Sequence, residues 1–229
     1  FRLIDGQEKA ICVEVLFADQ EGTEREIVTF SDTASPSVLS IHDSPAGAPL
    51  FEDMDGDSVI DILVPTQGLE EGTGYETYLI WYRWSRGKFV ENRSVNIVRN
   101  LNLFLDTCSR FLREGKWEAF CAAAYNPRTV SALRRQGLSY FSIAMKGFTL
   151  TGVPEGAPFV SPFLEKNPPV SVVFPVLLEN PFNLGKGLPA IVPISARFST
   201  PEQGDFLYSL RIVLAENPFE KQQYYIDLH

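Results

Sequence analysis

The most chemically specific stretch of this sequence is a group of acidic residues around Gly56, all within residues 53–61. The acids are Asp53, Asp55, Asp57 and Asp61. Calcium takes about six to eight oxygen ligands from carboxylates, backbone carbonyls and water, so an acid-rich loop suits it. Carboxylates this close together repel one another, and a bound cation holds them in a compact loop. We therefore predict a calcium site made by these four side chains and the carbonyl of Val59. The alternative is a solvated acidic turn.

The spacing of the acids does not fit an EF-hand, the calcium loop that lies between two helices. The glycine is at the fourth loop position instead of the sixth, and the twelfth position is Val64 instead of a glutamate. The loop is followed by the apolar run 60–64 and Pro65, and a β-branched run closed by proline is typical of a strand. We therefore expect the loop to join or border strands.

Residues 51–63 resemble the calcium loop of FG-GAP and VCBS-type repeats, whose pattern is Asp-x-Asp/Asn-Gly-Asp-x-x-x-Asp followed by a hydrophobic strand. Several copies build a propeller in those families, but this sequence has no second copy, so we do not expect one. Single loops of this type occur in periplasmic bacterial proteins similar to lysozyme inhibitors and secretion-effector immunity proteins. This chain resembles those periplasmic proteins over roughly residues 10–105. After the loop it has, in the same order, a polar stretch at 67–74, an aromatic strand at 75–82 and a Gly-Lys-Phe turn within 85–90.

The resemblance implies a periplasmic or secreted calcium-binding protein that neutralises a bacterial effector, such as a type VI effector, or a cell-wall hydrolase. The formal net charge of −9 fits a basic protein partner, because opposite charges speed encounter. It fits equally well an acidic surface that only keeps the protein in solution. It argues against nucleic acid, which is bound by clustered lysine and arginine. No apolar run reaches the roughly 18 residues of a membrane span.

The sequence offers little for catalysis, and we expect a protein that is not an enzyme. Its two histidines make no metal-binding pair, and neither a Gly-x-Ser-x-Gly elbow nor a phosphate loop is present. The adjacent residues of His42-Asp43-Ser44 seldom converge as a triad. A hydrolase with paired carboxylates is the most distant alternative.

A carbohydrate-binding or adhesin-like module is the main alternative, because aromatic residues crowd the predicted strand at 75–82 and the position after it. They are Tyr75, Tyr78, Trp81, Tyr82 and Trp84. Both alternate faces of this strand are largely apolar, which indicates that most of these rings belong to the core. Tyr82, Arg83 and Trp84 are then the residues that we expect at the surface, as candidates for binding.

Cys108 and Cys121 form a candidate disulfide. We interpret residues 103–122 as a hairpin that breaks at 113–116, which would place the two cysteines across paired strands if the geometry permits. An exported protein would form this bond. The third cysteine, Cys12, is expected to be buried in a strand as a small hydrophobic residue.

The remaining patterns predict a mainly β fold. Residues 1–122 are expected to form an antiparallel β domain with one calcium loop, and residues 123–229 a second β-rich domain with one short helix. Asn126 and Pro127 predict the start of that helix and Gly137 its end, giving a helix over 127–136. Residues 138–145 and 148–153 are interpreted as a hairpin, 154–169 as a loop, and 170–178, 190–198 and 206–215 as strands.

Overall fold

The computed structural model describes residues 2–5, 8–18, 23–31, 35–42, 48–70, 74–151, 162–202 and 204–228. The chain folds into two compact units. Unit 1 consists of Phe1–Val98 and Leu178–Gly187, and unit 2 consists of Arg99–Leu177 and Leu188–His229. The division between the units therefore falls at Val98, and the sequence-based boundary between residues 122 and 123 lies inside unit 2.

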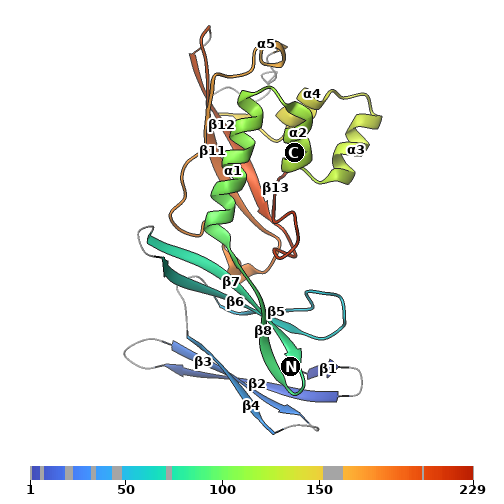
Figure 1. The fold of residues 1–229 in the computed structure, drawn as a ribbon, viewed down its shortest axis with the longest axis vertical. Helices are drawn as coiled ribbons and strands as arrows, with labels where there is room; N and C mark the ends of the chain where they lie inside the picture. Colours follow the sequence, from blue (N-terminus) through green and yellow to red (C-terminus); the bar gives the residue numbers. More distant parts are fainter. Residues whose placement is uncertain are drawn as a thin grey trace. The chain divides into compact units, whose positions relative to one another are not determined.

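Unit 1 contains two four-stranded antiparallel sheets, each formed by strands that follow one another along the chain (Figure 1). The first sheet contains β1 (Arg2–Asp5), β2 (Glu8–Ala18), β3 (Thr23–Ser31) and β4 (Ser37–His42). The second contains β5 (Leu50–Glu52), β6 (Asp61–Glu70), β7 (Gly74–Ser85) and β8 (Lys88–Asn96). Short antiparallel connections of this kind need only a turn between strands, and they keep sequence neighbours adjacent in the sheet.

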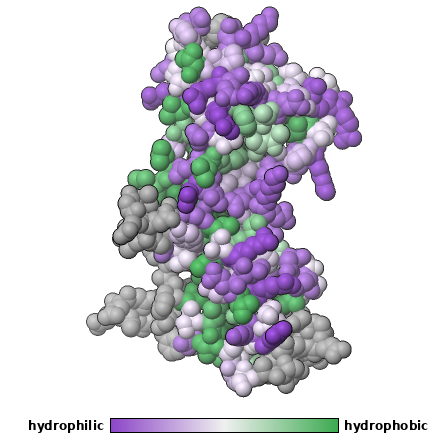
Figure 2. Space-filling view, viewed as in Figure 1, coloured by the Kyte–Doolittle hydropathy of each residue, from purple (hydrophilic) through white to green (hydrophobic). Residues whose placement is uncertain are grey.

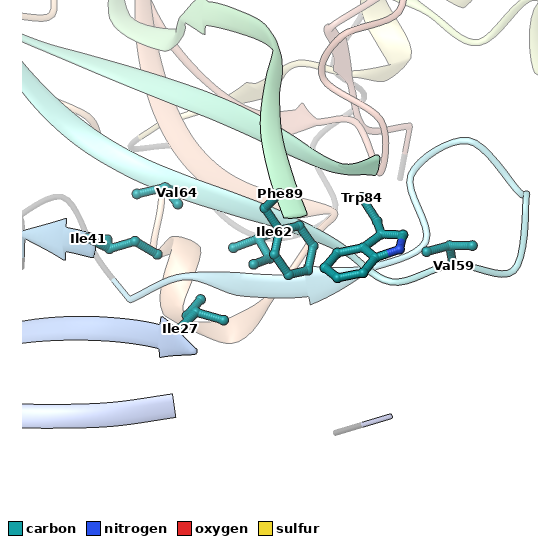
Figure 3. Packing of buried hydrophobic residues seen from close by; sticks show 7 residues of the cluster. All are labelled: Ile27, Ile41, Val59, Ile62, Val64, Trp84 and Phe89. Atoms are coloured by element: carbon teal, nitrogen blue, oxygen red, sulfur yellow. The ribbon is translucent and has the colours of Figure 1, made fainter. Parts of the chain in front are cut away.

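The two sheets of unit 1 share a hydrophobic core, drawn in Figure 3. Its buried residues are Ile27 and Ile41 from the first sheet and Val59, Ile62, Val64, Trp84 and Phe89 from the second sheet and its loop. Trp84 and Phe89 pack edge to face, with ring centroids 5.2 Å apart. The hydroxyl of Ser37 also donates a 3.2 Å hydrogen bond to the carbonyl of Gly87, so the sheets are joined by a polar contact as well.

Unit 2 combines a five-stranded antiparallel sheet with helices (Figure 1). The sheet order is β10 (Ser171–Val173), β11 (Ala190–Thr200), β12 (Gly204–Leu214) and β13 (Tyr224–Ile226), with β9 (Thr149–Leu150) also paired to β12. The helices are α1 (Ile97–Arg113), which starts at the end of unit 1, α2 (Trp117–Ala124), α3 (Pro127–Arg135), α4 (Tyr140–Lys146) and α5 (Pro162–Lys166). A 3₁₀ turn, η1 (Leu184–Lys186), belongs to unit 1.

The core of unit 2 lies between the sheet and the helices. On β11, Ile194, Ala196 and Phe198 are buried at alternate positions, as in a strand with one covered face. The buried stripe of α1 is Leu101, Leu105, Cys108 and Leu112, which is the spacing of one helix face. The hydroxyl of Ser109 donates to the carbonyl of Val172 at 2.6 Å, which ties α1 to the edge strand β10.

The prediction of a mainly β fold is confirmed, but the prediction of one short helix is wrong. The part of the chain that the structure describes contains five α-helices. The predicted helix at 127–136 is present as α3, where the side chain of Asn126 accepts a 2.9 Å hydrogen bond from Arg128 N. Residues 103–122 form α1 and α2 instead of a hairpin, and 138–145 lie largely in α4 instead of a strand. Of the predicted loop at 154–169, residues 162–166 form α5 and residues 154–161 lie outside the described residues.

The expected disulfide is absent, because Cys108 and Cys121 are buried free thiols on α1 and α2 instead of partners across paired strands. Burial raises the pKa of both thiols, that of Cys121 to about 12. Cys121 Sγ lies 3.3 Å from the carbonyl of Tyr140, a contact within the helical layer. Cys12 lies in β2, but its side chain is outside the described part of the structure.

Candidate metal site

The acidic loop, residues 53–60, connects β5 to β6 and is closed by antiparallel pairing of Glu52 with Asp61. It therefore joins two strands, as the flanking sequence predicts. Gly56 and Ser58 both have positive φ angles, of 78° and 67°. A glycine adopts this conformation without strain, whereas Ser58 does so at a cost that its surroundings must offset.

The aspartates organise the backbone of this loop by accepting its amide hydrogens. The carboxylate of Asp53 accepts from Gly56 N at 2.8 Å, Asp57 N at 3.1 Å and Ser58 N at 2.9 Å. Asp57 Oδ1 accepts from Val59 N at 2.8 Å. Aspartate side chains commonly stabilise turns in this way. The turn is therefore a folded structure, held by hydrogen bonds from its own backbone amides to Asp53 and Asp57.

Three of the four predicted acidic ligands come together. Asp53, Asp55 and Asp61 each present a carboxylate oxygen, and these oxygens all lie within 4.8 Å of one another. Calcium–oxygen distances are about 2.3 to 2.6 Å, so ligands on opposite sides of one ion are separated by roughly 5 Å. The spacing and the all-oxygen donor set therefore both fit a calcium ion.

The buried member of this cluster is Asp61, whose side chain is only 1% exposed. Its Oδ2 accepts a 3.1 Å hydrogen bond from Met54 N. The pKa of Asp61 is raised to about 6, mainly by burial and also by the charges of Asp55 and Asp57, although hydrogen bonds from Trp81 and Met54 act to lower it. A buried carboxylate next to other carboxylates is costly to ionise, and a cation among them would offset that cost.

Asp57 is not in this cluster, and its carboxylate pairs with Arg83 from β7. Arg83 Nη2 lies 2.7 Å from Asp57 Oδ2 and 3.1 Å from Asp55 Oδ2. Burial raises the pKa of Asp57, but the Arg83 hydrogen bond and charge and the Val59 amide outweigh it, so the pKa is lowered overall. Val59, the predicted carbonyl ligand, places its side chain in the core of unit 1 (Figure 3).

The role of Arg83 was not recognised in the sequence, where this residue was expected only as part of an exposed binding surface. The signal that could have found it is strand register. Ile62 pairs with Tyr82 between β6 and β7, so Arg83 follows at the end of β7 that lies beside the acidic loop.

The aromatic residues of β7 belong mainly to the core. Trp81 and Trp84 are 6% and 5% exposed, and Tyr82 is half-buried. The expectation that Trp84 lies at the surface is therefore wrong, because its ring packs against Phe89. Only Arg83 of the three expected surface residues is exposed. The side chain of Tyr75 is outside the described part of the structure. Because Trp84 is buried, it is not available to stack against a sugar on this strand.

No family model, curated protein or solved structure matches this chain. The resemblance to FG-GAP and VCBS loops consequently rests on the residues of the loop itself. Of the remaining sequence candidates, Asp43 and Ser44 lie outside the described residues. No helix in the described part of the chain has both the length and the apolar character to cross a membrane.

Proposed function

We propose that the acidic loop of unit 1 binds one calcium ion as a structural element. The observation that carries this proposal is the convergence of carboxylate oxygens from Asp53, Asp55 and Asp61. The other two ligands predicted from the sequence, Asp57 and the carbonyl of Val59, are not needed for this cluster, and water would complete the coordination shell. The ion would supply charge neutralisation and no reaction chemistry.

The ion's structural effect would act through the residues next to the acids. Met54 and Val59 are both buried, at 8% and 6% exposure, and both lie between acidic residues of the loop. Fixing the carboxylates therefore also fixes these side chains. Since an ion that binds only the folded state stabilises it, a hundredfold excess over Kd is worth about 2.7 kcal/mol.

We further propose that the whole protein is a secreted or periplasmic binding protein that neutralises a basic bacterial effector or cell-wall hydrolase and has no enzymatic activity itself. The distribution of charge supports this proposal. Residues 1–98 carry 18 acidic and 7 basic residues, so the acidic excess of the chain is concentrated in unit 1. A surface of this sign attracts a basic partner and accelerates its association.

The calcium proposal is tested by isothermal titration and thermal unfolding of the full chain with calcium, with magnesium and with EDTA. We expect calcium to bind and to raise Tm, and Asp55→Asn to lose most of both effects. Asp205→Asn, an exposed acid on β12, is the matched control and should behave as wild type. Absence of both calcium heat and a Tm change in the wild type would contradict the proposal.

The inhibitor proposal needs a separate assay. A basic lysozyme acting on a cell-wall suspension is the probe, with and without a molar excess of the protein, in calcium and in EDTA. We expect slower lysis in calcium. The same protein should also retain cell-wall hydrolases or effectors from a periplasmic extract. If lysis is unchanged and no such enzyme is retained, the neutralising function fails, whatever the outcome for calcium.

A further inference from the structure

Unit 2 contains a groove that the calcium proposal does not use. It has a volume of about 700 Å³ and is lined by α1, the end of α2 and residues 220–224. Ligand sites typically have volumes of roughly 300 to 1,000 Å³, so this groove has the size of a binding site. Every residue that lines it belongs to unit 2. The surface of unit 2 in view mixes hydrophobic with hydrophilic residues, without a purely apolar face (Figure 2).

The polar side of the groove is made of amide side chains. Asn100 Nδ2 donates a 2.8 Å hydrogen bond to Gln223 Oε1, which joins α1 to the segment before β13. Among the described residues, this pairing leaves Asn100 Oδ1 as an acceptor and Gln223 Nε2 as a donor. The oxygen and nitrogen of an amide side chain can be exchanged by a flip. If both amides were flipped, Asn100 would offer the donor and Gln223 the acceptor, so the pair would still present one of each. The pair therefore complements a group that both donates and accepts, as a hydroxyl does.

The segment that carries Gln223 is held in place by further hydrogen bonds before any ligand binds. Gln222 Nε2 donates to the carbonyl of Tyr125 at 3.2 Å, and Ala215 N donates to the carbonyl of Gln223 at 2.9 Å. The following residue, Tyr224, is buried in β13. Preorganised polar groups lose less entropy on binding, so the groove does not need to be reshaped by its ligand.

The charge and the apolar residues of the groove favour a neutral ligand that has both polar and apolar parts. Glu220 and Lys221 are its two charged residues and have opposite signs, so the lining carries no net charge. The apolar wall includes the rings of Phe104 and Tyr224, whose centroids are 5.8 Å apart, and Ala122, which is small and exposed. An ionic ligand gains little here, and a purely apolar ligand would leave the amides unpaired.

We propose that this groove binds a neutral saccharide. Its hydroxyls would bond to the free donor and acceptor of the Asn100–Gln223 pair, and its C–H face would pack against Phe104, the partly exposed ring of the wall. This site is distinct from the aromatic strand β7, and its existence does not depend on calcium binding by the acidic loop. A neutral extended peptide is the competing occupant, because backbone amides also donate and accept.

The test is a nuclear magnetic resonance titration of the isotope-labelled full chain with maltohexaose, cellohexaose and N-acetylchitohexaose, each run with and without EDTA. We expect at least one saccharide to shift the backbone amide signals of Ala122, Ala123 and Gln223 in a saturable way. Gln223→Ala, which removes the donor and the bond to Asn100, should weaken binding about fivefold. Gln136→Ala, an exposed glutamine at the end of α3, is the matched control and should bind as wild type.

A second variant covers the case in which Gln223→Ala fails to fold. Ala122→Gln extends an exposed side chain on α2 into the groove and should abolish the shifts while leaving the spectrum of a folded protein. If none of the three saccharides shifts the groove signals, the proposal is overturned. It is also overturned if capped neutral peptides shift them and the saccharides do not, since the groove is then a protein-docking surface.

Discussion

Arg83 Nη2 lies 2.7 Å from Asp57 Oδ2, so a guanidinium from β7 already serves as a cation for the acidic loop. The same nitrogen is 3.1 Å from Asp55 Oδ2, an acid of the three-carboxylate cluster. The Arg83 side chain is 45% exposed, which means that its pairs are screened by solvent and contribute little to folding stability. Arginine and calcium would thus compete for the same carboxylates.

We expect Arg83→Gln to strengthen calcium binding by about threefold to tenfold, because the ion no longer displaces a positive charge. The same change should lower stability in EDTA by no more than about 1 kcal/mol. Isothermal titration and urea unfolding measure the two effects. Lys88→Gln removes an exposed positive charge from β8 and is the control for a general charge effect. Equal or weaker calcium binding by Arg83→Gln would show that the two cations do not compete.

The raised pKa of Asp61 predicts a specific dependence of stability on pH. In the folded protein the group titrates at about 6, above its ordinary value of 3.8, so between these values the folded state binds more protons than the unfolded state. Its contribution to stability is therefore fully present below pH 3.8 and is lost as pH rises through about 6.

For the calcium-free protein this loss amounts to about 3 kcal/mol. Urea unfolding in EDTA across this range should show a decline in the wild type that is smaller in Asp61→Asn. Comparing the two removes the contribution of other carboxylates. Asp205→Asn should keep the wild-type slope. If the free energy of unfolding changed with pH in the same way for the wild type and Asp61→Asn, the raised pKa of Asp61 would be contradicted.

Gly147, at the end of α4, should not tolerate a side chain. A Cβ at this position would lie 2.6 Å from Ile226 Cγ2 and 2.7 Å from Tyr125 Oη, inside the packed core of unit 2. We expect Gly147→Ala to cost about 1 to 3 kcal/mol through overpacking. At Gly185 the nearest atom to a Cβ is 3.5 Å away, so Gly185→Ala is the control and should change stability little. If Gly147→Ala unfolded at the same urea concentration as the wild type, the close packing of Gly147 against Ile226 and Tyr125 would be refuted.

Cys108 and Cys121 should behave as inert buried thiols. Both are fully buried, and burial raises the pKa of each, which keeps them protonated and unreactive. In the native protein we expect slow labelling of both by a thiol reagent, with fast labelling after denaturation. Reductant should leave Tm unchanged. A Tm that falls with reductant, or an intact mass that shows a bond between these two cysteines, would restore the disulfide hypothesis.

The acidic loop and the strand that follows it were predictable because their signals are local. The loop has a specific spacing of aspartates, and the run after it is apolar and closed by Pro65. The helix α3 was predictable from its Asn126 cap and first-turn proline. These features do not depend on residues far away in the sequence.

The other helices were missed because their apolar residues fit two periods at once. Residues 101–105 are apolar except Asn102, a short run that also suits a strand, while the residues that the structure buries, Leu101, Leu105, Cys108 and Leu112, follow the helical period. The α2 segment is apolar at most positions and gives no period at all. The pairing of Arg83 with the loop needs the β6–β7 register, which short-range patterns do not contain.

Leu178–Gly187 belongs to unit 1, although the segments on both sides of it in the sequence belong to unit 2. A Cβ on Gly187 would lie 3.7 Å from Glu52 Oε1, so the end of this segment lies next to β5, the strand that precedes the acidic loop. Neither unit is a continuous piece of chain. A fragment that stops at Val98 would lack ten residues of its own unit, and cleavage anywhere between Arg99 and Leu177 would leave two pieces that each hold part of unit 1.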